Sequence, residues 1–433
     1  MNHSAVERSS PMELTTADRN PSYYAQVRHH KNLVYAWRKV YESGIKSKSL
    51  ETKKEICAFN ENLDNKIDKI YRRLLKKKYN FTPAKGIPVK RKHKTDRPIV
   101  KSIIPDRIVQ RSILDVLQSH TQIRDYISLK TSFGGIEERG VRDAIKMAYE
   151  AIQNGAKCYI SSDIKNFFSD IPKDKVLEII SGYIPDTDFN NLLQSAVKVE
   201  LENLSELGEK KELFPIYEIG VAQGCCLSPF VGNMLLHDFD LKFNDRGIIC
   251  LRYIDDFLIL GPTPRHVKAA FKSAKKMLND LGLSVYDPFE DEQKAHFGST
   301  EKKIEFLGCD ILPGLIRPSK KGCDSFLERV EKMLTESSRL MSGSLKIFVK
   351  GKSFIETLTD VSNIIMGWGS QYSFCNDFSL MSELDRQINL MLKTYLQEYE
   401  RAKCTCKEDS VTVRRLLGVR LLAGDCKSDP IIC

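Results

Sequence analysis

Two adjacent aspartates interrupt an apolar stretch of the chain, RYIDDFLIL at residues 252–260. Asp255 and Asp256 place like charges in a segment otherwise suited to a pair of buried strands. Ionised carboxylates in apolar surroundings are costly unless something neutralises them, and a bound metal cation is the usual neutralising partner. An Asp-Asp pair by itself is more typical of a surface turn, but the apolar residues on both sides favour a metal site.

A third carboxylate, Asp163, ends another apolar strand, KCYISSDI. A tight turn within residues 252–260 would aim Asp255 and Asp256 out of the sheet. Three carboxylates at neighbouring strand ends can hold two magnesium ions about 3.5–4 Å apart, which activate an attacking hydroxyl and stabilise a leaving pyrophosphate. The pattern therefore predicts the chemistry of a nucleic-acid polymerase.

Positive charge is concentrated in one part of the chain. The net charge is +10 overall, but residues 65–111 hold 16 Lys or Arg against three Asp, so the remainder is slightly acidic. An imbalance sustained over such a length favours a polyanionic partner over a solvated helix face. No amphipathic anchor accompanies it, so we expect nucleic acid and no membrane. The candidate nucleic-acid-binding residues are Lys76, Lys77, Lys78, Arg91, Lys92 and Lys94.

Strand signals and helical segments are mixed without a regular β-α-β repeat, which predicts an α+β fold. We expect residues 1–20 to be a disordered tail and residues 23–79 to be helical. The segment IPVKRKHKTDRPIV predicts two strands joined by a basic turn at Lys94–Asp96.

Apolar residues at helical spacing are expected to face the core in three places. The first stripe belongs to an amphipathic helix, and the other two follow Pro318, where the chain becomes mainly helical. The stripes are Ile67, Ile70, Leu74 and Leu75; Phe354, Leu358, Val361, Ile365 and Trp368; and Leu384, Ile388, Met391 and Tyr395.

Several motifs, in matching order, resemble those of reverse transcriptases. RYIDDFLIL resembles the Y-x-D-D box, SSDIKNFFSDIP the first metal-binding motif, VAQGCCLSPFVGN the Q-G-x-x-x-S-P-x-x-x-N motif and IEFLGCDI the F-L-G segment. IPVKRKHKTDRPIVKSIIPDRIVQRSIL is similar to the fingers of group II intron and retron enzymes, and GWGSQY (367–372) to the first thumb helix of intron-type enzymes. The resemblance covers residues 30 to about 372.

This resemblance implies a right-hand polymerase with fingers, a palm containing an antiparallel sheet, a helical thumb and a helical C-terminal extension. The expected divisions are residues 1–20 (tail), 21–130 (N-terminal helices and basic fingers), 131–314 (palm with interleaved fingers elements) and 315–433 (thumb and extension).

The resemblance also implies roles for individual residues. Asp163 and Asp255 would be the principal ligands of two Mg²⁺ ions, Asp256 would complete the acidic cluster, and Ile164 is included among the metal-binding residues. Lys294 is the candidate general acid that protonates pyrophosphate, although YDPFEDEQKAHF is longer and more acidic than the intron pattern.

A second set of residues would bind the incoming deoxynucleoside triphosphate. Lys90 and Arg97 would meet its phosphates, and a guanidinium fork suits phosphate oxygens. The Phe168 ring would act as a steric gate against a 2′-hydroxyl, whereas Phe167 is expected in the core. Gln223 and Gly224 would contact the nascent base pair, since glycine allows close backbone approach.

The branch of the family is narrowed by departures from its patterns. HTQIRD and the residues after 314 lack the retron elements, and LIRPSKKG with its helical continuation looks more like the unknown-group reverse transcriptases of bacterial antiphage defence. We expect a cytoplasmic enzyme that copies a structured non-coding RNA into cDNA, with a second copy or an accessory defence protein as further partners. The alternatives are a retron or group II intron-type enzyme, a template-independent terminal transferase and a catalytically idle RNA-binding scaffold.

Overall fold

The computed structural model describes residues 22–47, 49–91, 94–244, 247–342, 352–405 and 410–419. The expected tail at residues 1–20 and the candidate Lys92 lie outside these ranges, and of Lys94 only the backbone is described. The chain divides into two compact units. Unit 1 comprises Met1–Gly140, Ile160–Ile259 and Arg265–His296, and unit 2 comprises Val141–Tyr159, Leu260–Pro264 and Phe297–Cys433.

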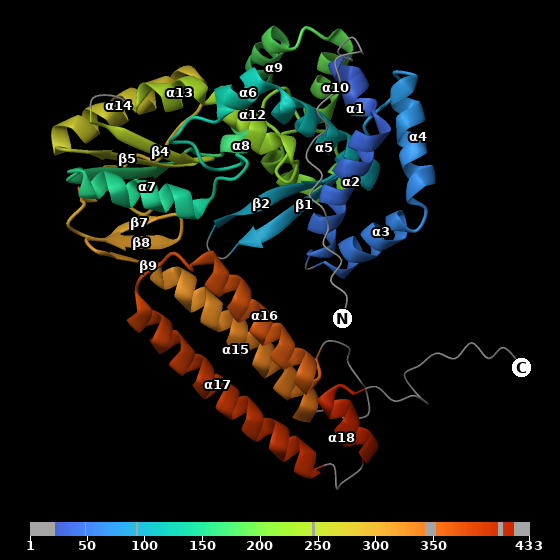
Figure 1. The fold of residues 1–433 in the computed structure, drawn as a ribbon, viewed down its shortest axis with the longest axis vertical. Coiled ribbons are helices and arrows are strands. Elements are labelled where there is room, and N and C mark those ends of the chain that lie inside the picture. Colours follow the sequence, from blue (N-terminus) through green and yellow to red (C-terminus); the bar gives the residue numbers. More distant parts are fainter. Residues whose placement is uncertain are drawn as a thin grey trace, which may run out of the picture. The chain divides into compact units, whose positions relative to one another are not determined.

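Unit 1 begins with a group of helices (Figure 1). They are α1 (Tyr23–Arg28), α2 (His30–Ile45), α3 (Leu50–Asn60), α4 (Leu63–Leu75), α5 (Ile104–Ser119) and α6 (Thr121–Ile127). In α4, Ile67, Ile70 and Leu74 are buried as expected, but Leu75 is 49% exposed. The expectation for Leu75 was wrong because one residue turns a helix by about 100°, which moves Leu75 off the buried face.

The predicted hairpin of the basic segment is confirmed as β1 (Lys85–Arg91) and β2 (Lys94–Lys101), which pair antiparallel. The turn was misplaced: Lys94 pairs with Arg91, so Lys94–Asp96 forms the beginning of β2. The Asn203 side chain anchors the hairpin by accepting from the Gly86 N–H (2.8 Å) and donating to the Gly86 carbonyl (3.0 Å).

A four-stranded sheet in the order β4-β5-β3-β6 forms the centre of the next region of the chain. Its strands are β3 (Cys158–Asp163), β4 (Ile249–Tyr253), β5 (Asp256–Gly261) and β6 (His296–Ser299). The Phe257 ring of β5 contacts Phe239 and Phe271, so helices α13 and α14 cover this part of the sheet. The remaining helices of this region are α8 (Phe167–Asp170), α9 (Lys173–Tyr183), α10 (Thr187–Val197), α11 (Leu204–Leu207), the 3-10 helix η1 (Gly208–Leu213), α12 (Leu227–Leu235), α13 (His237–Lys242) and α14 (Pro264–Asp280).

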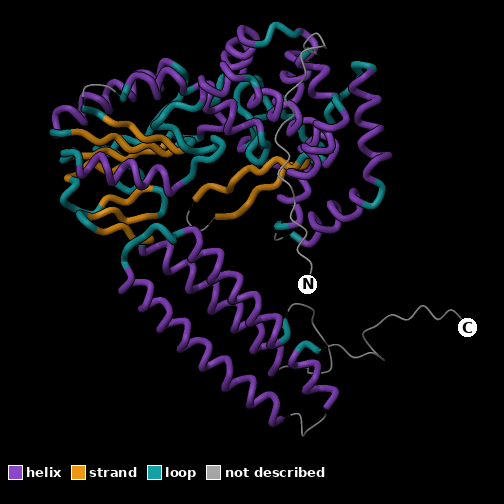
Figure 2. The backbone as a smooth tube through the Cα atoms, viewed as in Figure 1, coloured by secondary structure: helices purple, strands orange, loops and turns teal. Residues whose placement is uncertain are grey.

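Unit 2 joins a small antiparallel sheet to long helices (Figure 2). Its elements are α7 (Val141–Gln153), β7 (Ile304–Phe306), β8 (Cys309–Leu312), β9 (Leu315–Pro318), α15 (Lys320–Ser342), α16 (Phe354–Gln371), α17 (Phe378–Thr405) and α18 (Ser410–Leu417). Helix α16 begins with a capping box formed by Ser353 and Glu356.

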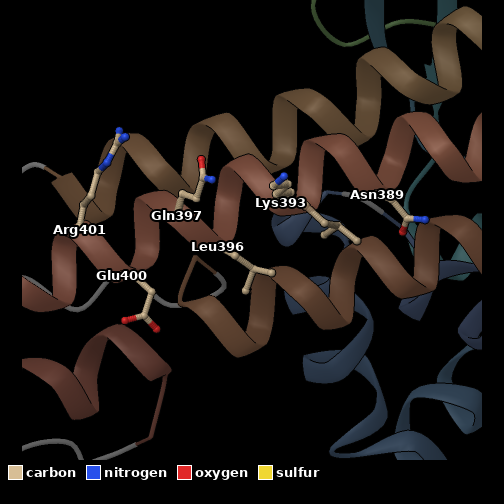
Figure 3. Close-up of a pocket in the computed structure, with 7 residues that line it drawn as sticks. Asn389, Lys393, Leu396, Gln397, Glu400 and Arg401 are labelled. Atoms are coloured by element: carbon tan, nitrogen blue, oxygen red, sulfur yellow. The ribbon is translucent and has the colours of Figure 1, made fainter.

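The two apolar stripes expected after Pro318 are confirmed, because all of their residues are buried in unit 2 or pack against its buried core. Phe326 stacks on Trp368 at 4.4 Å and Phe354 on Tyr399 at 4.2 Å between ring centroids. An open groove follows α17 beside this core (Figure 3). It is lined by Asn389, Leu392, Lys393, Leu396, Gln397, Glu400 and Arg401.

No helix in the described ranges has both the length and the apolar character needed to cross a membrane. The mixture of helices and sheets confirms the predicted α+β fold class, and the C-terminal part is helical as expected. The four-part division into tail, fingers, palm and thumb stays a prediction.

Candidate active site

The two adjacent aspartates lie at the tip of the predicted β4–β5 hairpin. Strand β4 ends at Tyr253 and β5 begins at Asp256, so Ile254 and Asp255 form the turn. Ile254 has a φ of +62°, which is rare for a β-branched residue and marks a turn held in place by its surroundings. Asp255 is half-buried and Asp256 is exposed.

Asp163 lies beside this turn because β3 is the neighbour of β5 in the sheet. The Ile164 N–H donates to the Asp255 carbonyl at 3.1 Å, and the Tyr286 N–H donates to the Asp163 carbonyl at 3.2 Å. The Asp163 and Asp255 side chains are close enough for each to influence the pKa of the other. The prediction that Asp163 and the 255–256 pair meet at neighbouring strand ends is thus matched by the geometry.

The carboxyl groups are electrostatically strained. Burial, followed by the Asp255 and Asp256 carboxylates, raises the pKa of Asp163 to about 7. Burial also raises the pKa of Asp255, while the nearby Arg97 charge opposes that rise. Two acids in one partly buried place cannot both ionise cheaply without a cation, so this region attracts positive charge.

One atom is left ready for a cation: Asp163 Oδ1 is buried and has no hydrogen-bond partner. Hard carboxylate oxygens are the ligands that Mg²⁺ prefers, so the donor set fits this ion. As the side chains stand, the described part of the chain presents no group of three or more His, Cys, Asp or Glu arranged around a metal position. The side chain of Ile164 is apolar and only 1% exposed, so only its backbone could contribute a ligand.

Arg97, Gln223 and Gly224, predicted to bind the nucleotide, come together near this cluster. Arg97 Nε donates to Gln223 Oε1 at 3.0 Å, and the Val100 N–H donates to the Gln223 carbonyl at 2.8 Å. Gly224 has a φ of +111°, and a Cβ there would lie 3.1 Å from the Val100 carbonyl oxygen. A side chain at position 224 would therefore crowd the backbone of β2, which explains the glycine there. Lys90 is exposed on β1.

The two neighbouring phenylalanines have different surroundings. Phe167 is 2% exposed, and its ring fills the space above Gly232, so the expectation that it belongs to the core is matched. Phe168 is only partly buried, and it lies in the short helix α8 after β3, not in the strand. Its carbonyl accepts from the Val221 N–H at 2.7 Å, which ties Phe168 to the segment that carries Gln223.

Comparison with known proteins assigns this chain to a family. The family model described as "Reverse transcriptase (RNA-dependent DNA polymerase)" matches residues 87–311, more than half of the chain. The chain belongs to the reverse transcriptase family. The matched segment contains all three aspartates and the Arg97–Gln223 pair.

Two curated proteins and one solved structure illustrate the similarity. An uncharacterised 91 kDa protein in the cob intron of Schizosaccharomyces pombe is 29% identical over 174 residues, 40% of this chain and 20% of that protein. The group II intron-encoded protein LtrA of Lactococcus lactis is 23% identical over 299 residues, 68% of this chain and 46% of LtrA. This chain thus matches less than half of either relative. The apo telomerase of Candida tropicalis aligns with a TM-score of 0.39 and 15% identity over 74% of this chain and 62% of its own.

In this reverse transcriptase, two residues that the sequence analysis did not assign to the site lie near the candidate Lys294: Tyr286, in the loop after α14, and Lys165, which follows β3. The Lys294 ammonium, whose charge partly opposes the rise in the pKa of Asp163, lies 4.6 Å from the centre of the Tyr286 ring. The Lys165 ammonium lies 4.7 Å from the same ring and pairs with Asp291 at 3.2 Å. Lys165 lies two residues after Asp163, and that short spacing was the available signal.

Of the candidate nucleic-acid-binding residues, Lys76, Lys77, Lys78 and Arg91 are exposed but not equivalent. Lys76, Lys77 and Lys78 come after the last residue of α4, so they do not lie on a face of that helix. Lys77 pairs with Asp188. Arg91 Nε donates to the Thr95 carbonyl within the hairpin at 2.9 Å. The assignment of these residues to nucleic-acid binding stays a prediction.

Proposed function

We propose that this protein is an RNA-directed DNA polymerase that synthesises cDNA by two-metal-ion nucleotidyl transfer. The observation that carries the proposal is the pairing of Asp163 with Asp255 around a buried, unpartnered carboxylate oxygen. Membership of the reverse transcriptase family supports it.

Asp163 and Asp255 would hold the metal ions, and Asp256 would complete the negative cluster. Bound magnesium would supply activation of the primer hydroxyl and stabilisation of the pyrophosphate. The donor set would be completed by substrate oxygens and water, as is usual for Mg²⁺.

Arg97 would bind the triphosphate, and Gln223 would orient its guanidinium through their hydrogen bond. The exposed position of Arg97 leaves its remaining donors accessible to phosphate oxygens. Phe168 would lie against the sugar, because its half-buried ring is attached to the same segment as Gln223. Lys294 would donate a proton to the leaving pyrophosphate, a role supported by its charge acting on Asp163.

The test is primer extension by the full chain on an RNA template with a DNA primer, deoxynucleotides and Mg²⁺. Template-directed products of the correct sequence support the proposal. Products of arbitrary sequence without template would favour the terminal transferase, and RNA binding without synthesis would favour the idle scaffold. Chelation of the metal by EDTA should stop synthesis, and excess Mg²⁺ should restore it.

The finer proposal is that the enzyme copies a dedicated non-coding RNA in the cytoplasm during antiphage defence. Its support is the resemblance of LIRPSKKG and of the helical continuation to defence-associated enzymes. Sequencing of the RNA and DNA that copurify with the protein would identify template and product. Cells that express the protein should survive phage infection better than cells with an Asp255→Ala/Asp256→Ala variant, whereas equal survival would contradict the defence role.

A further inference from the structure

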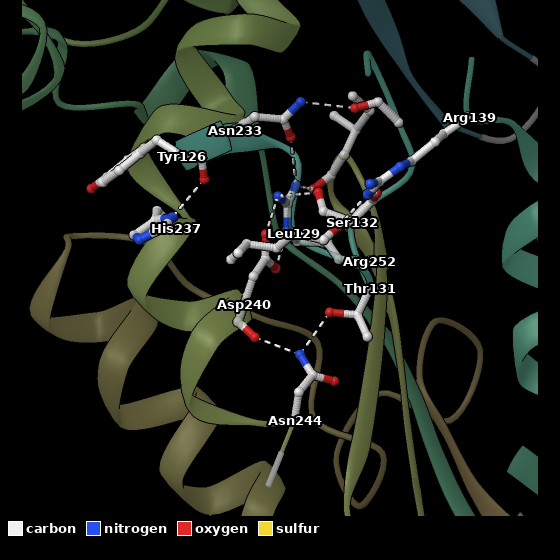
Figure 4. A network of polar contacts seen from close by, with 12 residues as sticks. Tyr126, Leu129, Thr131, Ser132, Arg139, Asn233, His237, Asp240, Asn244 and Arg252 are labelled. Atoms are coloured by element: carbon white, nitrogen blue, oxygen red, sulfur yellow. Dashed lines mark hydrogen bonds and ion pairs between the residues drawn. The ribbon is translucent and has the colours of Figure 1, made fainter. Parts of the chain in front are cut away.

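Arg252, three residues before the catalytic Asp255, is fully buried, with 0% of its surface exposed. A charge inside an apolar strand is costly unless every donor is satisfied. All five N–H groups of this guanidinium have acceptors (Figure 4). The acceptors are Asp240 Oδ1 (2.8 Å) and Oδ2 (2.6 Å), Asn233 Oδ1 (3.0 Å), Ser132 Oγ (2.8 Å) and the Ile254 carbonyl (2.9 Å).

The last of these bonds reaches the turn that carries Asp255. Ile254 adopts a φ of +62°, a conformation that a β-branched residue keeps only when its surroundings enforce it. Arg252 Nη1 holds the carbonyl of this residue. Gly134 closes the other side, because a Cβ there would lie 2.8 Å from the Ile254 nitrogen.

The acceptors themselves are fixed by the elements around the hairpin. Asn233 lies on α12 and is 1% exposed, and its Nδ2 donates to the Gly134 carbonyl at 2.9 Å. Asp240 lies on α13 and is 3% exposed. The backbone of residues 131–133 pairs with Arg252 on both sides, through Arg252 N–H to Thr131 carbonyl (2.8 Å) and Phe133 N–H to Arg252 carbonyl (2.9 Å). The guanidinium therefore connects two helices and a loop to one turn.

Stability alone is a poor explanation for this arrangement. A buried ion pair is often matched or exceeded in stability by apolar residues of similar volume. What apolar residues cannot supply is a directed donor to the Ile254 carbonyl. The network thus supplies a directed hydrogen bond to the Ile254 carbonyl, at the residue before Asp255.

We infer that Arg252, held by Asp240 and Asn233, is a positioning residue that fixes the Ile254–Asp255 turn so that the Asp255 carboxylate meets Asp163 at the metal position. Arg252 does not touch substrate in this role. The inference rests on the proposed two-metal function, but it concerns divalent-cation binding as well as synthesis.

The test compares Arg252→Lys with the wild-type protein in two measurements: Mn²⁺ affinity from electron paramagnetic resonance of free Mn²⁺, and the single-turnover rate of deoxynucleotide incorporation. Lysine keeps the charge beside Asp240 but cannot bond all five acceptors. We expect Mn²⁺ affinity and rate each to fall by about 10- to 100-fold. The matched control is Arg139→Lys, since Arg139 also donates to loop carbonyls, those of Ser128 (2.9 Å), Ser132 (3.1 Å) and Leu129, but not to the turn. Its Mn²⁺ affinity should stay within about twofold of the wild type.

A rescue variant separates positioning from general stabilisation. Glycine adopts positive φ without strain, so in an Ile254→Gly background the turn depends less on Arg252. The effect of Arg252→Lys on Mn²⁺ affinity should shrink there to about twofold. An equal effect in both backgrounds would contradict positioning, as would a folded Arg252→Lys protein with wild-type affinity and rate.

Two further outcomes also test the inference. If Arg252→Lys does not fold, Asn233→Ala replaces it, because that change removes one acceptor of Nη1 while the pair with Asp240 remains; unchanged Mn²⁺ affinity would then overturn the inference. If the wild-type protein binds Mn²⁺ but incorporates no nucleotide, the proposed function fails, and the inference is still judged by Mn²⁺ affinity alone.

Discussion

The β4–β5 hairpin buries its arginine among five acceptors, whereas the β1–β2 hairpin exposes Lys85, Lys90, Arg91 and Arg97 to solvent. Arg252 has no accessible surface, while Arg97 is exposed and makes a side-chain hydrogen bond to Gln223 at 3.0 Å. The β1–β2 hairpin is strongly basic, whereas residues 249–261 of the β4–β5 hairpin hold one Arg against two Asp. Their charges must therefore be used differently.

Because of this difference, we expect changes in the two hairpins to affect different measured quantities. A buried charge whose donors are all satisfied fixes geometry and is screened little by salt. An exposed charge is available to a phosphate and loses its effect as salt rises. We therefore expect changes in the β4–β5 hairpin to act on the rate of chemistry, and changes in the β1–β2 hairpin to act on binding.

The largest effect should come from the tip of the buried hairpin. Replacing Asp255 and Asp256 by Ala together should reduce incorporation by at least about 1000-fold, because the metal ligands are lost. The melting temperature should be retained, since removing both carboxylates also removes their repulsion with Asp163. Primer extension and thermal unfolding measure the two quantities, with Asp280→Ala, an exposed acid on α14, as the control. Full synthesis by the double variant would end the catalytic assignment.

The open hairpin should respond in substrate binding instead. Arg97→Ala removes a charged donor to the triphosphate and should raise KM for deoxynucleotides by about 10- to 100-fold with a smaller change in kcat. Arg91→Ala is the matched control, because Arg91 lies on the same hairpin but donates to the Thr95 carbonyl. A fall in kcat with unchanged KM for Arg97→Ala would remove the distinction between the hairpins.

Much of the site could be predicted from the sequence because its signals are local. Asp163 ends an apolar strand and the 255–256 pair lies at the end of another, and neighbouring strand ends in one sheet lie close together. The local signals also explain the errors. Leu75 is apolar, but its position in the helical turn places it off the buried face. The turn predicted at Lys94–Asp96 was wrong because the register of the hairpin, which pairs Arg91 with Lys94, cannot be read from the sequence.

The supporting network could not be predicted, because its signals are not local. Arg252 appears in the sequence as one more basic residue, and its partners Ser132, Asn233 and Asp240 lie 120, 19 and 12 residues away. Only the packing of α12, α13 and the 131–134 loop around β4 brings them together. Sequence patterns therefore identify the charged residues proposed to act on the substrate more readily than the buried residues that hold them in place.

A smaller effect, on the choice of sugar, should come from Phe168 in α8. If the half-buried Phe168 ring closes the space beside the sugar 2′ carbon, Phe168→Val should lower the preference for deoxynucleotides over ribonucleotides by about tenfold. Phe167→Val is the control: its ring is buried, so truncation should cost about 1–3 kcal/mol of stability and depress incorporation of both sugars equally. Incorporation assays with both nucleotide types, together with melting temperatures, separate the two. Loss of stability without a change in selectivity for Phe168→Val would show that it is a core residue.

The smallest effect concerns the lysines after α4, and it tests whether exposure alone makes a charge available to nucleic acid. Lys76 and Lys78 are exposed, whereas the Lys77 ammonium is already paired with Asp188. Each phosphate neutralised adds about 0.7–0.9 to the slope of log affinity against log salt concentration. Lys76→Gln with Lys78→Gln should therefore flatten the slope of RNA binding by about 1.4–1.8.

Lys77→Gln is the matched control and should flatten the slope less than either neighbour, because the bond to Asp188 competes with phosphate. Fluorescence anisotropy of labelled RNA over a series of salt concentrations measures each slope. If all three lysines behave alike, the pair with Asp188 does not hold Lys77 in solution, and exposure alone governs the contribution. If none changes the slope, the RNA does not contact the end of α4, and the excess charge of residues 65–111 acts through the β1–β2 hairpin instead.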